Sequence, residues 1–274
     1  MERIILIETS TALCSTALAE NGAIVSYRES SAPKAHASLT AVFVQEMLSE
    51  RGLSLSDCDA VCVSMGPGSY TGLRVGVSTA KGLCFGSGKP LLAVGTLDTL
   101  VAQAEDVLAE GSDVIPSPSS VILSEHDVIP SPSSVIPSEH DVIPSEHDVI
   151  PSEVEGSPYR FIIPMIDARR MEVYTAVFEN GHQITGTAPA IIDENSFADY
   201  LAQGPCLFIG DGAGKCADVI KHPNARFCQC QPKASAMLEP ALAALHAGNF
   251  QDVAYFEPFY LKEFVATVSK KKLW

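Results

Sequence analysis

The sequence predicts an α/β fold in which one unit, a mixed β-sheet with helices on its faces, occurs twice in tandem. An internal duplication is the first reason: a shift of about 159 positions places residues 4–22 on residues 163–181. The second reason is the order of apolar segments, because strand patterns open each half and helix and strand patterns then alternate. The third is a glycine-rich loop at 66–74, between a strand pattern and a helix pattern.

The duplication holds one register over about twenty residues. Glu8 falls on Asp167, and 16–22 falls on 175–181, so in each copy an apolar strand ends in a carboxylate. An Asn-Gly pair closes both matched segments, and this pair favours a β-hairpin because both residues tolerate positive φ angles. We therefore interpret the chain as two copies of one unit.

The elements follow from short apolar runs between turn residues, which predict strands, and from apolar positions every three to four residues, which predict helices. In the first copy we expect strands near 3–8, 13–19, 23–28, 59–65 and 90–94, and helices near 37–51, 71–86 and 96–109. In the second copy we expect strands near 160–167, 171–178, 183–191 and 206–210, and helices near 195–203, 214–221 and 234–247. Three antiparallel strands followed by alternating helices and parallel strands form a ribonuclease-H-like unit, and two such units in tandem form the actin-like architecture.

In the actin-like architecture, nucleotide binds in the cleft between the two units. Glu8 and Asp167, each at the end of a first strand, would then face each other and could hold a hydrated Mg²⁺. Taken alone, strand-end carboxylates are also typical of solvated turns. No cofactor is required by these patterns, and the expectation is at most weak binding of ATP or ADP with magnesium.

The loop Gly66–Arg74 is a second candidate site. Gly66 and Gly68 permit backbone angles that other residues resist, and Pro67 stiffens the turn. Ser69 or Thr71 can cap the following helix and leave its first N–H groups available to an anion or a partner. The alternative is a turn that needs glycine for packing alone.

Residues 112–153 form a low-complexity tract that does not belong to either unit. The heptapeptide Ser-Glu-His-Asp-Val-Ile-Pro occurs three times in it, and a proline in or beside every unit excludes a continuous helix or coiled coil. We expect a disordered, extended linker. The predicted domains are a first unit at 1–111, this linker, and a second unit at 154–274.

The composition is that of an acidic cytoplasmic protein. The net charge is −15, of which eight acidic residues lie in the tract, so the remainder is near −7 and argues against autonomous nucleic-acid binding. No apolar run approaches the ~18 residues of a membrane helix, and the chain enters a strand at once, without a signal peptide. Eight cysteines without a C-x-x-C pair are expected to be reduced and to bind no metal. The tail Lys270–Lys272 is a solvated terminus or, alternatively, a tRNA contact.

Six segments resemble motifs of the TsaB family, formerly called YeaZ: Ile7–Thr11, Gly66–Gly76, Asp167–Arg170, Glu172–Tyr174, Gly210–Gly212 and Pro258–Lys262. The resemblance implies the actin-like fold and a role in bacterial synthesis of threonylcarbamoyladenosine in tRNA. It implies a TsaD-like catalytic paralogue and a TsaE-like ATPase as partners, a possible homodimer, and tRNA contact only through the complex. It adds Thr9, Ser10, Gly68, Ser69, Gly210 and Gly212 to Glu8 and Asp167 as candidate nucleotide contacts. Two departures are Glu8, where the family usually has aspartate, and the tract.

The absence of one histidine pattern decides between enzyme and partner. The catalytic paralogue binds its metal with a His-x-x-x-His pair, whereas the equivalent stretch here, 94–100, contains no histidine. We therefore expect a non-catalytic subunit. The alternatives are a small-molecule kinase or ATPase of the actin-like superfamily and a metalloprotease, and no H-E-x-x-H sequence supports the latter.

Two helices are candidates for a partner interface. The helix near 37–51 is apolar on two faces, so one face would meet the core and the other a partner. The helix near 71–86 has small residues four apart, which allows close helix approach. The resemblance implies a four-helix interface built on this pair, with contacts from Leu39, Phe43, Met47, Leu48, Gly72, Gly76 and Ala80. The alternative is that both helices are central in one core.

Overall fold

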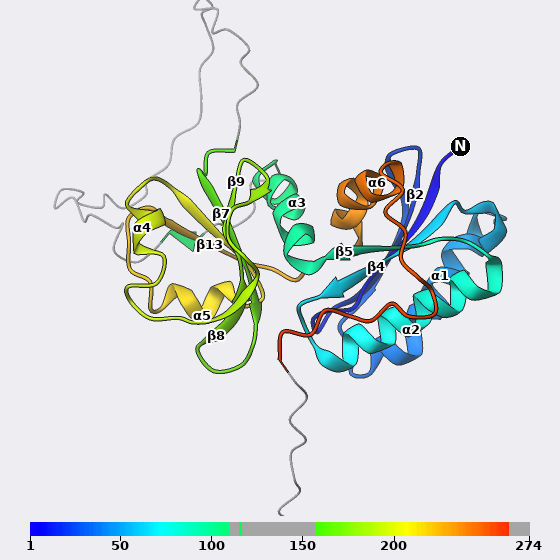
Figure 1. Ribbon diagram of the computed structural model, residues 1–274, viewed down its shortest axis with the longest axis horizontal. Helices are drawn as coiled ribbons and strands as arrows, with labels where there is room; N and C mark the ends of the chain where they lie inside the picture. The colour runs from blue at the N-terminus through cyan, green and yellow to red at the C-terminus, as the bar shows by residue number, and fades with distance from the viewer. Residues whose placement is uncertain (110–114, 117–156, 263–274) are drawn as a thin grey trace, which may run out of the picture.

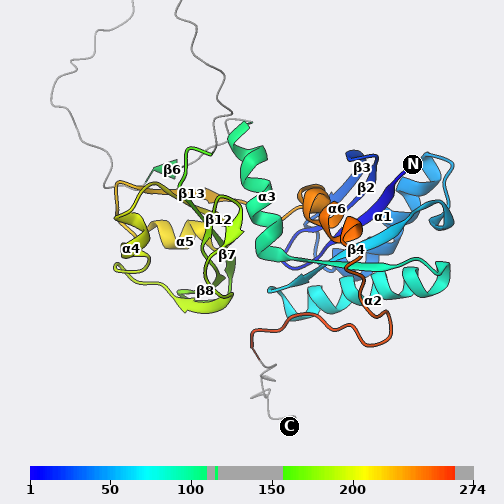
Figure 2. The ribbon, with the colours of Figure 1, turned by 45° about the horizontal axis from the view of Figure 1, so that its top comes forward.

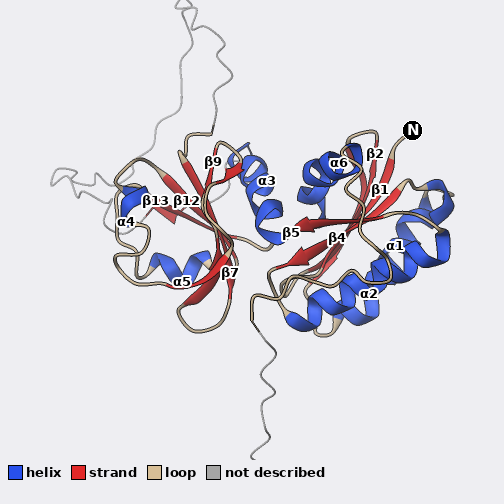
Figure 3. Ribbon diagram, in the orientation of Figure 1, coloured by secondary structure: helices blue, strands red, loops and turns tan. Residues whose placement is uncertain are grey.

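The computed structural model describes residues 1–109, 115–116 and 157–262 of the 274-residue chain. Two α/β units lie side by side, each with helices against both faces of its sheet (Figures 1 and 3). The expected tandem α/β architecture is therefore confirmed. Most of the tract at 112–153 lies outside the described residues. Its residues Ile115–Pro116 form the short strand β6, which pairs with an edge of the second sheet.

The first unit contains a five-stranded sheet in the order β3-β2-β1-β4-β5. β1 pairs with β2 and β2 with β3 in antiparallel fashion, whereas β1, β4 and β5 run parallel. β1 is almost wholly apolar and buried, as a strand covered on both faces must be. The strands are β1 Arg3–Glu8, β2 Cys14–Glu20, β3 Ala23–Ser30, β4 Ala60–Gly66 and β5 Leu91–Gly95.

Helices α1 (Ala35–Glu50) and α2 (Tyr70–Ser87) cover one face of this sheet. Ser69 is the N-cap of α2, and its hydroxyl oxygen accepts a hydrogen bond from the Gly72 N–H at 3.3 Å, so the expected cap is confirmed. A short 3-10 helix, η1 (Leu55–Asp57), precedes β4. None of the helices in the described ranges combines the length and the apolarity that a bilayer crossing needs.

The second unit repeats the order of the first. β7 (Phe161–Asp167), β12 (Cys206–Gly210) and β13 (Ala225–Gln229) run parallel. The predicted second and third strands are each broken in two, as β8 (Glu172–Thr175) with β9 (Phe178–Glu179) and β10 (His182–Gln183) with β11 (Ala188–Ile191). β7 pairs with both β8 and β9. Strand β13 was not expected from the sequence.

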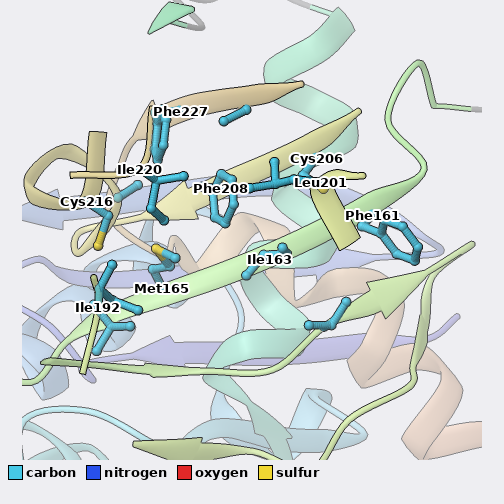
Figure 4. Close-up of a cluster of buried hydrophobic side chains, with 14 residues drawn as sticks. Phe161, Ile163, Met165, Ile192, Leu201, Cys206, Phe208, Cys216, Ile220 and Phe227 are labelled. Atoms are coloured by element: carbon cyan, nitrogen blue, oxygen red, sulfur yellow. The ribbon is translucent and has the colours of Figure 1, made fainter. Parts of the chain in front are cut away.

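The core of the second unit lies between its sheet and two short helices, α4 (Ala198–Leu201) and α5 (Ala213–Ala217). Figure 4 shows its aromatic centre, where Phe208 stacks on Phe227 with ring centroids 4.9 Å apart. Both helices are shorter than the sequence patterns predicted. None of the eight cysteines forms a disulfide in this structure, and all but Cys230 are buried, so they pack as small apolar side chains.

The two hairpins of the duplication have nearly the same backbone. Asn21 and Gly22 have φ angles of 50° and 78°, and Asn180 and Gly181 have φ angles of 51° and 75°. The hairpins also close on equivalent strand pairs, Glu20 with Ala23 and Glu179 with His182. These positive φ angles explain why both copies keep Asn-Gly.

Each unit contributes a helix to the other. Helix α3 (Thr96–Ala109) follows β5 of the first sheet, yet Leu97 and Leu100 pack against Ile162 and Leu207 of the second sheet. Conversely, η3 (Ala234–Met237) and α6 (Leu238–His246) follow β13 and pack on the first sheet. Figure 2 shows α3 and α6 between the two sheets. The predicted domain limits stay predictions. In the structure, however, α3 packs on the sheet of the second unit, and η3 and α6 pack on the sheet of the first.

The last described segment, 250–262, returns along α2 (Figure 1). The Lys81 ammonium donates to the carbonyl oxygens of Ala254 and Phe256, both at 3.0 Å, and the Phe259 N–H donates to the Met65 carbonyl oxygen at 2.7 Å. Lys262 at its end forms an ion pair with Glu172 of the second unit. We call 250–262 the C-terminal strap.

Candidate functional site

The carboxylate that ends β1 is enclosed by protein. Glu8 is 0% exposed, and its Oε1 accepts a hydrogen bond from the Ser10 N–H at 2.6 Å. Among the described residues its Oε2 has no hydrogen-bond partner, nor have the buried hydroxyls of Ser10 and Thr11. Burial raises the pKa of Glu8 from 4.5 to about 7, although the hydrogen bond from the Ser10 N–H favours the charged form.

The turn that follows Glu8 is packed onto α2. The Thr9 hydroxyl donates to the Gly72 carbonyl oxygen at 2.9 Å, and the Ser69 N–H donates to the Ser10 carbonyl oxygen at 2.6 Å. A Cβ atom at Gly72 would clash with the Thr9 carbonyl oxygen, and one at Gly76 would clash with the Thr9 hydroxyl. Gly72 and Gly76 therefore allow this turn, and not a partner helix, to approach α2 closely.

Gly66 and Gly68 serve the same packing. Gly66 has a φ of 105°, which confirms the positive angle expected there, whereas a Cβ atom at Gly68 would clash with the Ser10 carbonyl oxygen. Ser69 uses its hydroxyl on Gly72 within the helix. The loop is thus joined to the Glu8 turn, which favours the packing interpretation of the loop over an open anion site.

The equivalent carboxylate of the second unit has a different environment. Asp167 is exposed, and its Oδ1 accepts hydrogen bonds from the Lys215 ammonium at 2.8 Å and the Arg169 N–H at 2.6 Å. Lys215 also donates to the Glu172 carbonyl oxygen at 2.7 Å. A lysine therefore supplies the positive charge that a metal would otherwise bring to Asp167.

The remaining candidate contacts lie at the end of β12. The Gly212 N–H donates to the Met165 carbonyl oxygen at 3.0 Å, and Gly210 is the last residue of the strand. Asp211, between them, accepts a hydrogen bond from the Asp167 N–H at 2.8 Å, and burial raises its pKa to about 6. These groups bind one another within the second unit.

The residues of the predicted nucleotide site do not fit a magnesium nucleotide in this arrangement. Magnesium prefers exposed carboxylates that keep several water ligands. Glu8 is enclosed, its raised pKa keeps much of it protonated near neutral pH, and Asp167 is neutralised by Lys215. Within the described ranges no group of three or more His, Cys, Asp or Glu side chains is arranged to hold a metal ion.

The predicted interface is corrected for five of its seven residues. All five of these residues, Met47, Leu48, Gly72, Gly76 and Ala80, are buried inside the monomer, because Met47, Leu48 and Ala80 face their own sheet and the two glycines face the Thr9 turn. Leu39 and Phe43 are half-buried, and Val42, which the sequence interpretation did not include, is 40% exposed. Leu39, Val42 and Phe43 are three and four positions apart on α1 and form one exposed apolar strip.

Two groups of residues were missed from the sequence. Lys215 lies 48 positions from Asp167, and no local pattern links the two. Arg74 and Tyr70 of α2 meet Tyr260 of the C-terminal strap, with the two tyrosine ring centroids 4.7 Å apart. The only available signal for the second group was that both segments belong to motifs resembling one family.

Comparison with known proteins gives a consistent result. The "tRNA threonylcarbamoyladenosine biosynthesis protein TsaB" of Escherichia coli (strain K12) is 38% identical over 102 residues, which are 37% of this chain and 44% of that protein. The protein of the same name from Haemophilus influenzae is 36% identical over 112 residues, which are 41% of this chain and 47% of that protein. The structure "YeaZ from Pseudomonas aeruginosa" superposes with a TM-score of 0.67 over 95% of this chain and 100% of that one, at 23% identity.

Over these segments the chain is similar to proteins of the TsaB (YeaZ) family. A family model described as "TsaD: tRNA N6-adenosine threonylcarbamoyltransferase" also matches residues 27–124 of the chain. The matches to the two TsaB proteins span about half the length of those curated relatives. The match to the solved YeaZ structure concerns the fold, and it extends over both units.

Proposed function

We propose that the chain is a non-catalytic subunit in the synthesis of threonylcarbamoyladenosine in tRNA, and that it acts in the cytoplasm by pairing with a TsaD-like paralogue. The observation that carries this proposal is the enclosure of the Glu8 turn. Its carboxylate is buried and its backbone is packed onto α2, so the first unit uses this turn to build its own core. The names of the curated relatives support the pathway.

The surface for pairing is the strip of Leu39, Val42 and Phe43 on α1. The strip is apolar and partly exposed, and it lies on the first unit beside α2. Exposed apolar side chains at helical spacing are typical of a helix that meets another protein. A TsaD-like partner, a TsaE-like ATPase and a second copy of this chain are the candidate partners, and tRNA would be bound by the complex.

Co-purification tests the pairing. We expect the tagged chain to retain the TsaD-like protein of the same genome, and Phe43→Glu to lose it while the monomer stays folded, because Phe43 is half-exposed. Gln45→Glu, an exposed position on the same helix, is the matched control and should keep the partner. Retention of the partner by Phe43→Glu would refute the strip as the interface.

A second measurement tests the pathway. The chain alone should form no threonylcarbamoyladenosine from threonylcarbamoyl-adenylate and tRNA, whereas the chain with its TsaD-like partner should. Modification by the chain alone would contradict a non-catalytic role. Unchanged modification by the partner with and without the chain would contradict the pathway itself.

A further inference from the structure

A groove lies between α2 and the C-terminal strap. It has a volume of about 520 Å³ and is distinct from the Glu8 turn and from the strip on α1. Its walls combine basic, aromatic and hydroxyl side chains: Tyr70, Arg74, Ser78 and Lys81 from α2, and Phe256, Glu257, Pro258 and Tyr260 from the strap, with Val77 at the base.

Two cations line this groove without a carboxylate partner among the described residues. The Arg74 guanidinium lies over the Tyr70 ring, 5.3 Å from its centroid, and donates to the Tyr70 hydroxyl at 3.0 Å. The Lys81 ammonium donates to two backbone carbonyl oxygens and to no acidic side chain. Arg74 and Lys81 are seven positions apart on the helix, which places them on one face about 10 Å apart along the axis.

Aromatic side chains stand beside these charges. Tyr70 and Tyr260 are in ring contact, with an interplanar angle of 37°, and both are half-exposed. Tyrosine and arginine planes offer a surface on which an unpaired base stacks, and their hydroxyl and guanidinium groups reach phosphate and sugar oxygens. An acidic peptide would satisfy the two cations but would make no use of the aromatic pair.

We infer that this groove is an RNA contact, with Arg74 and Lys81 at backbone phosphates and the Tyr70–Tyr260 pair against an unpaired base. The inference rests on the proposed function, which supplies RNA as the substrate of the complex. In a chain with a net charge of −15, such a contact is short and strongly dependent on salt. Glu257 is the one acidic side chain among the described residues that line the groove, and its negative charge weakens binding of RNA phosphates there.

Binding of a fluorescein-labelled tRNA transcript to the complex of the full chain with its TsaD-like partner tests the inference by anisotropy between 50 and 200 mM KCl. Arg74→Gln should weaken binding several-fold and reduce the slope of log K against log salt by about 0.7, the value for one contact to a single strand. Glu257→Gln should strengthen binding, because it removes the opposing charge. Lys221→Gln, an exposed lysine of the second unit that hydrogen-bonds only a carbonyl of its own segment, is the matched control.

The RNA contact would be supported if Arg74→Gln weakens tRNA binding, Glu257→Gln strengthens it, and Lys221→Gln binds tRNA as the wild type does. An equal loss of tRNA affinity in Arg74→Gln and Lys221→Gln would overturn the RNA contact. If Arg74→Gln instead weakens binding of a labelled oligoglutamate peptide and leaves tRNA binding unchanged, the groove binds acidic peptide and the inference is wrong. A wild-type chain that leaves tRNA modification unchanged refutes the proposed function, whereas failure of the groove variants alone refutes only the RNA contact.

Discussion

Glu8 shows how burial can reverse the role that its position suggests. A carboxylate at the end of β1 is placed to meet a cleft, but this one is fully enclosed and one of its oxygens has no partner. A buried carboxylate without a cation is favoured in its neutral form. Folding therefore binds a proton at Glu8 at pH values where the unfolded chain would release it.

The first prediction follows from this pKa. The folded pKa, about 7, exceeds the ordinary 4.5, so the stability linked to Glu8 is complete below pH 4.5 and is lost as the pH rises to about 7. The loss corresponds to roughly 3 kcal/mol. In urea unfolding at pH 5 and pH 8, Glu8→Gln should show a smaller loss of stability between the two pH values than wild type. The control is Glu239→Gln, at an exposed position on α6, which should lose as much free energy of unfolding between pH 5 and pH 8 as wild type. A loss in Glu8→Gln equal to that of wild type would contradict the prediction.

The second prediction uses two glycines of one helix. Gly76→Ala should lower the free energy of unfolding by about 1–3 kcal/mol, because its Cβ would clash with the Thr9 hydroxyl and force that turn to move. Gly82→Ala has open space at the Cβ position and should raise stability by about 0.5–1 kcal/mol through helix propensity. Chemical denaturation measures both. Stabilisation by both substitutions would show that the Thr9 turn does not constrain α2.

At the residue scale the sequence was informative about local contacts and silent about distant ones. It identified the equivalence of Glu8 with Asp167 and the Ser69 cap, because both follow from neighbouring residues. It did not reveal that Gly72 and Gly76 accommodate Thr9, since that contact joins segments more than 60 positions apart. Small residues four apart fit a partner helix and a packed turn equally well, so only the tertiary structure could decide.

Among the elements, the C-terminal strap has two hydrogen bonds to a side chain of α2, and both come from Lys81. The Lys81 ammonium donates to the carbonyl oxygens of Ala254 and Phe256, which lie in a segment without helix or strand. Segments fixed by few hydrogen bonds open at low free-energy cost. The strap is therefore the element of the described chain that we expect to open first.

The third prediction concerns this element. Lys81→Met keeps the aliphatic part of the side chain and removes both hydrogen bonds, so amide hydrogen exchange at 254–260 should increase about tenfold or more, while exchange in β1 and β4 stays unchanged. Lys221→Met, whose ammonium binds the Ala217 carbonyl oxygen nearby, is the control and should leave 254–260 unaffected. Unchanged exchange in Lys81→Met would mean that other contacts hold the strap.

The sequence predicted the long elements better than the short ones. In the first unit each expected strand and helix is present with bounds shifted by a few residues, because long apolar runs define them. In the second unit the broken strands β8 to β11 and the short helices carry weaker patterns. Strand β13, Ala-Arg-Phe-Cys-Gln, has only five residues and no regular alternation of polar and apolar side chains, so its pattern is weak.

For the whole molecule, the fourth prediction is that magnesium ATP does not stabilise the chain. A ligand that binds only the folded state stabilises it by RT ln(1 + [L]/Kd) and so raises its melting temperature. Because Glu8 is enclosed and Asp167 is paired with Lys215, we expect 5 mM magnesium ATP to shift the melting temperature no more than 5 mM magnesium chloride with sodium sulfate. A shift of several degrees with ATP alone would contradict it.

The tandem architecture could be predicted from the sequence because the duplication preserved its hairpins, Asn21-Gly22 and Asn180-Gly181, in one register. The packing of α3 and α6 on the sheet of the other unit could not be predicted from the sequence. No local pattern indicates that α3 leaves its own sheet for the other, since its apolar face fits either sheet equally well. The hydrogen bonds that fix this exchange, from the Gln103 amide to the Gln231 carbonyl oxygen and from the Lys233 N–H to the Gln103 side chain, join positions 128 and 130 apart.

The exchange of helices has a consequence for the order in which the protein is made. One face of the first sheet, with Ile4, Leu6 and Leu92, is covered by Met237 and Ala241 of η3 and α6. On the ribosome that face stays uncovered until residues 234–241 have emerged, although β1 and β5 are synthesised more than 130 residues earlier. We therefore expect the nascent first unit to present an apolar surface to chaperones until η3 and α6 have left the ribosome.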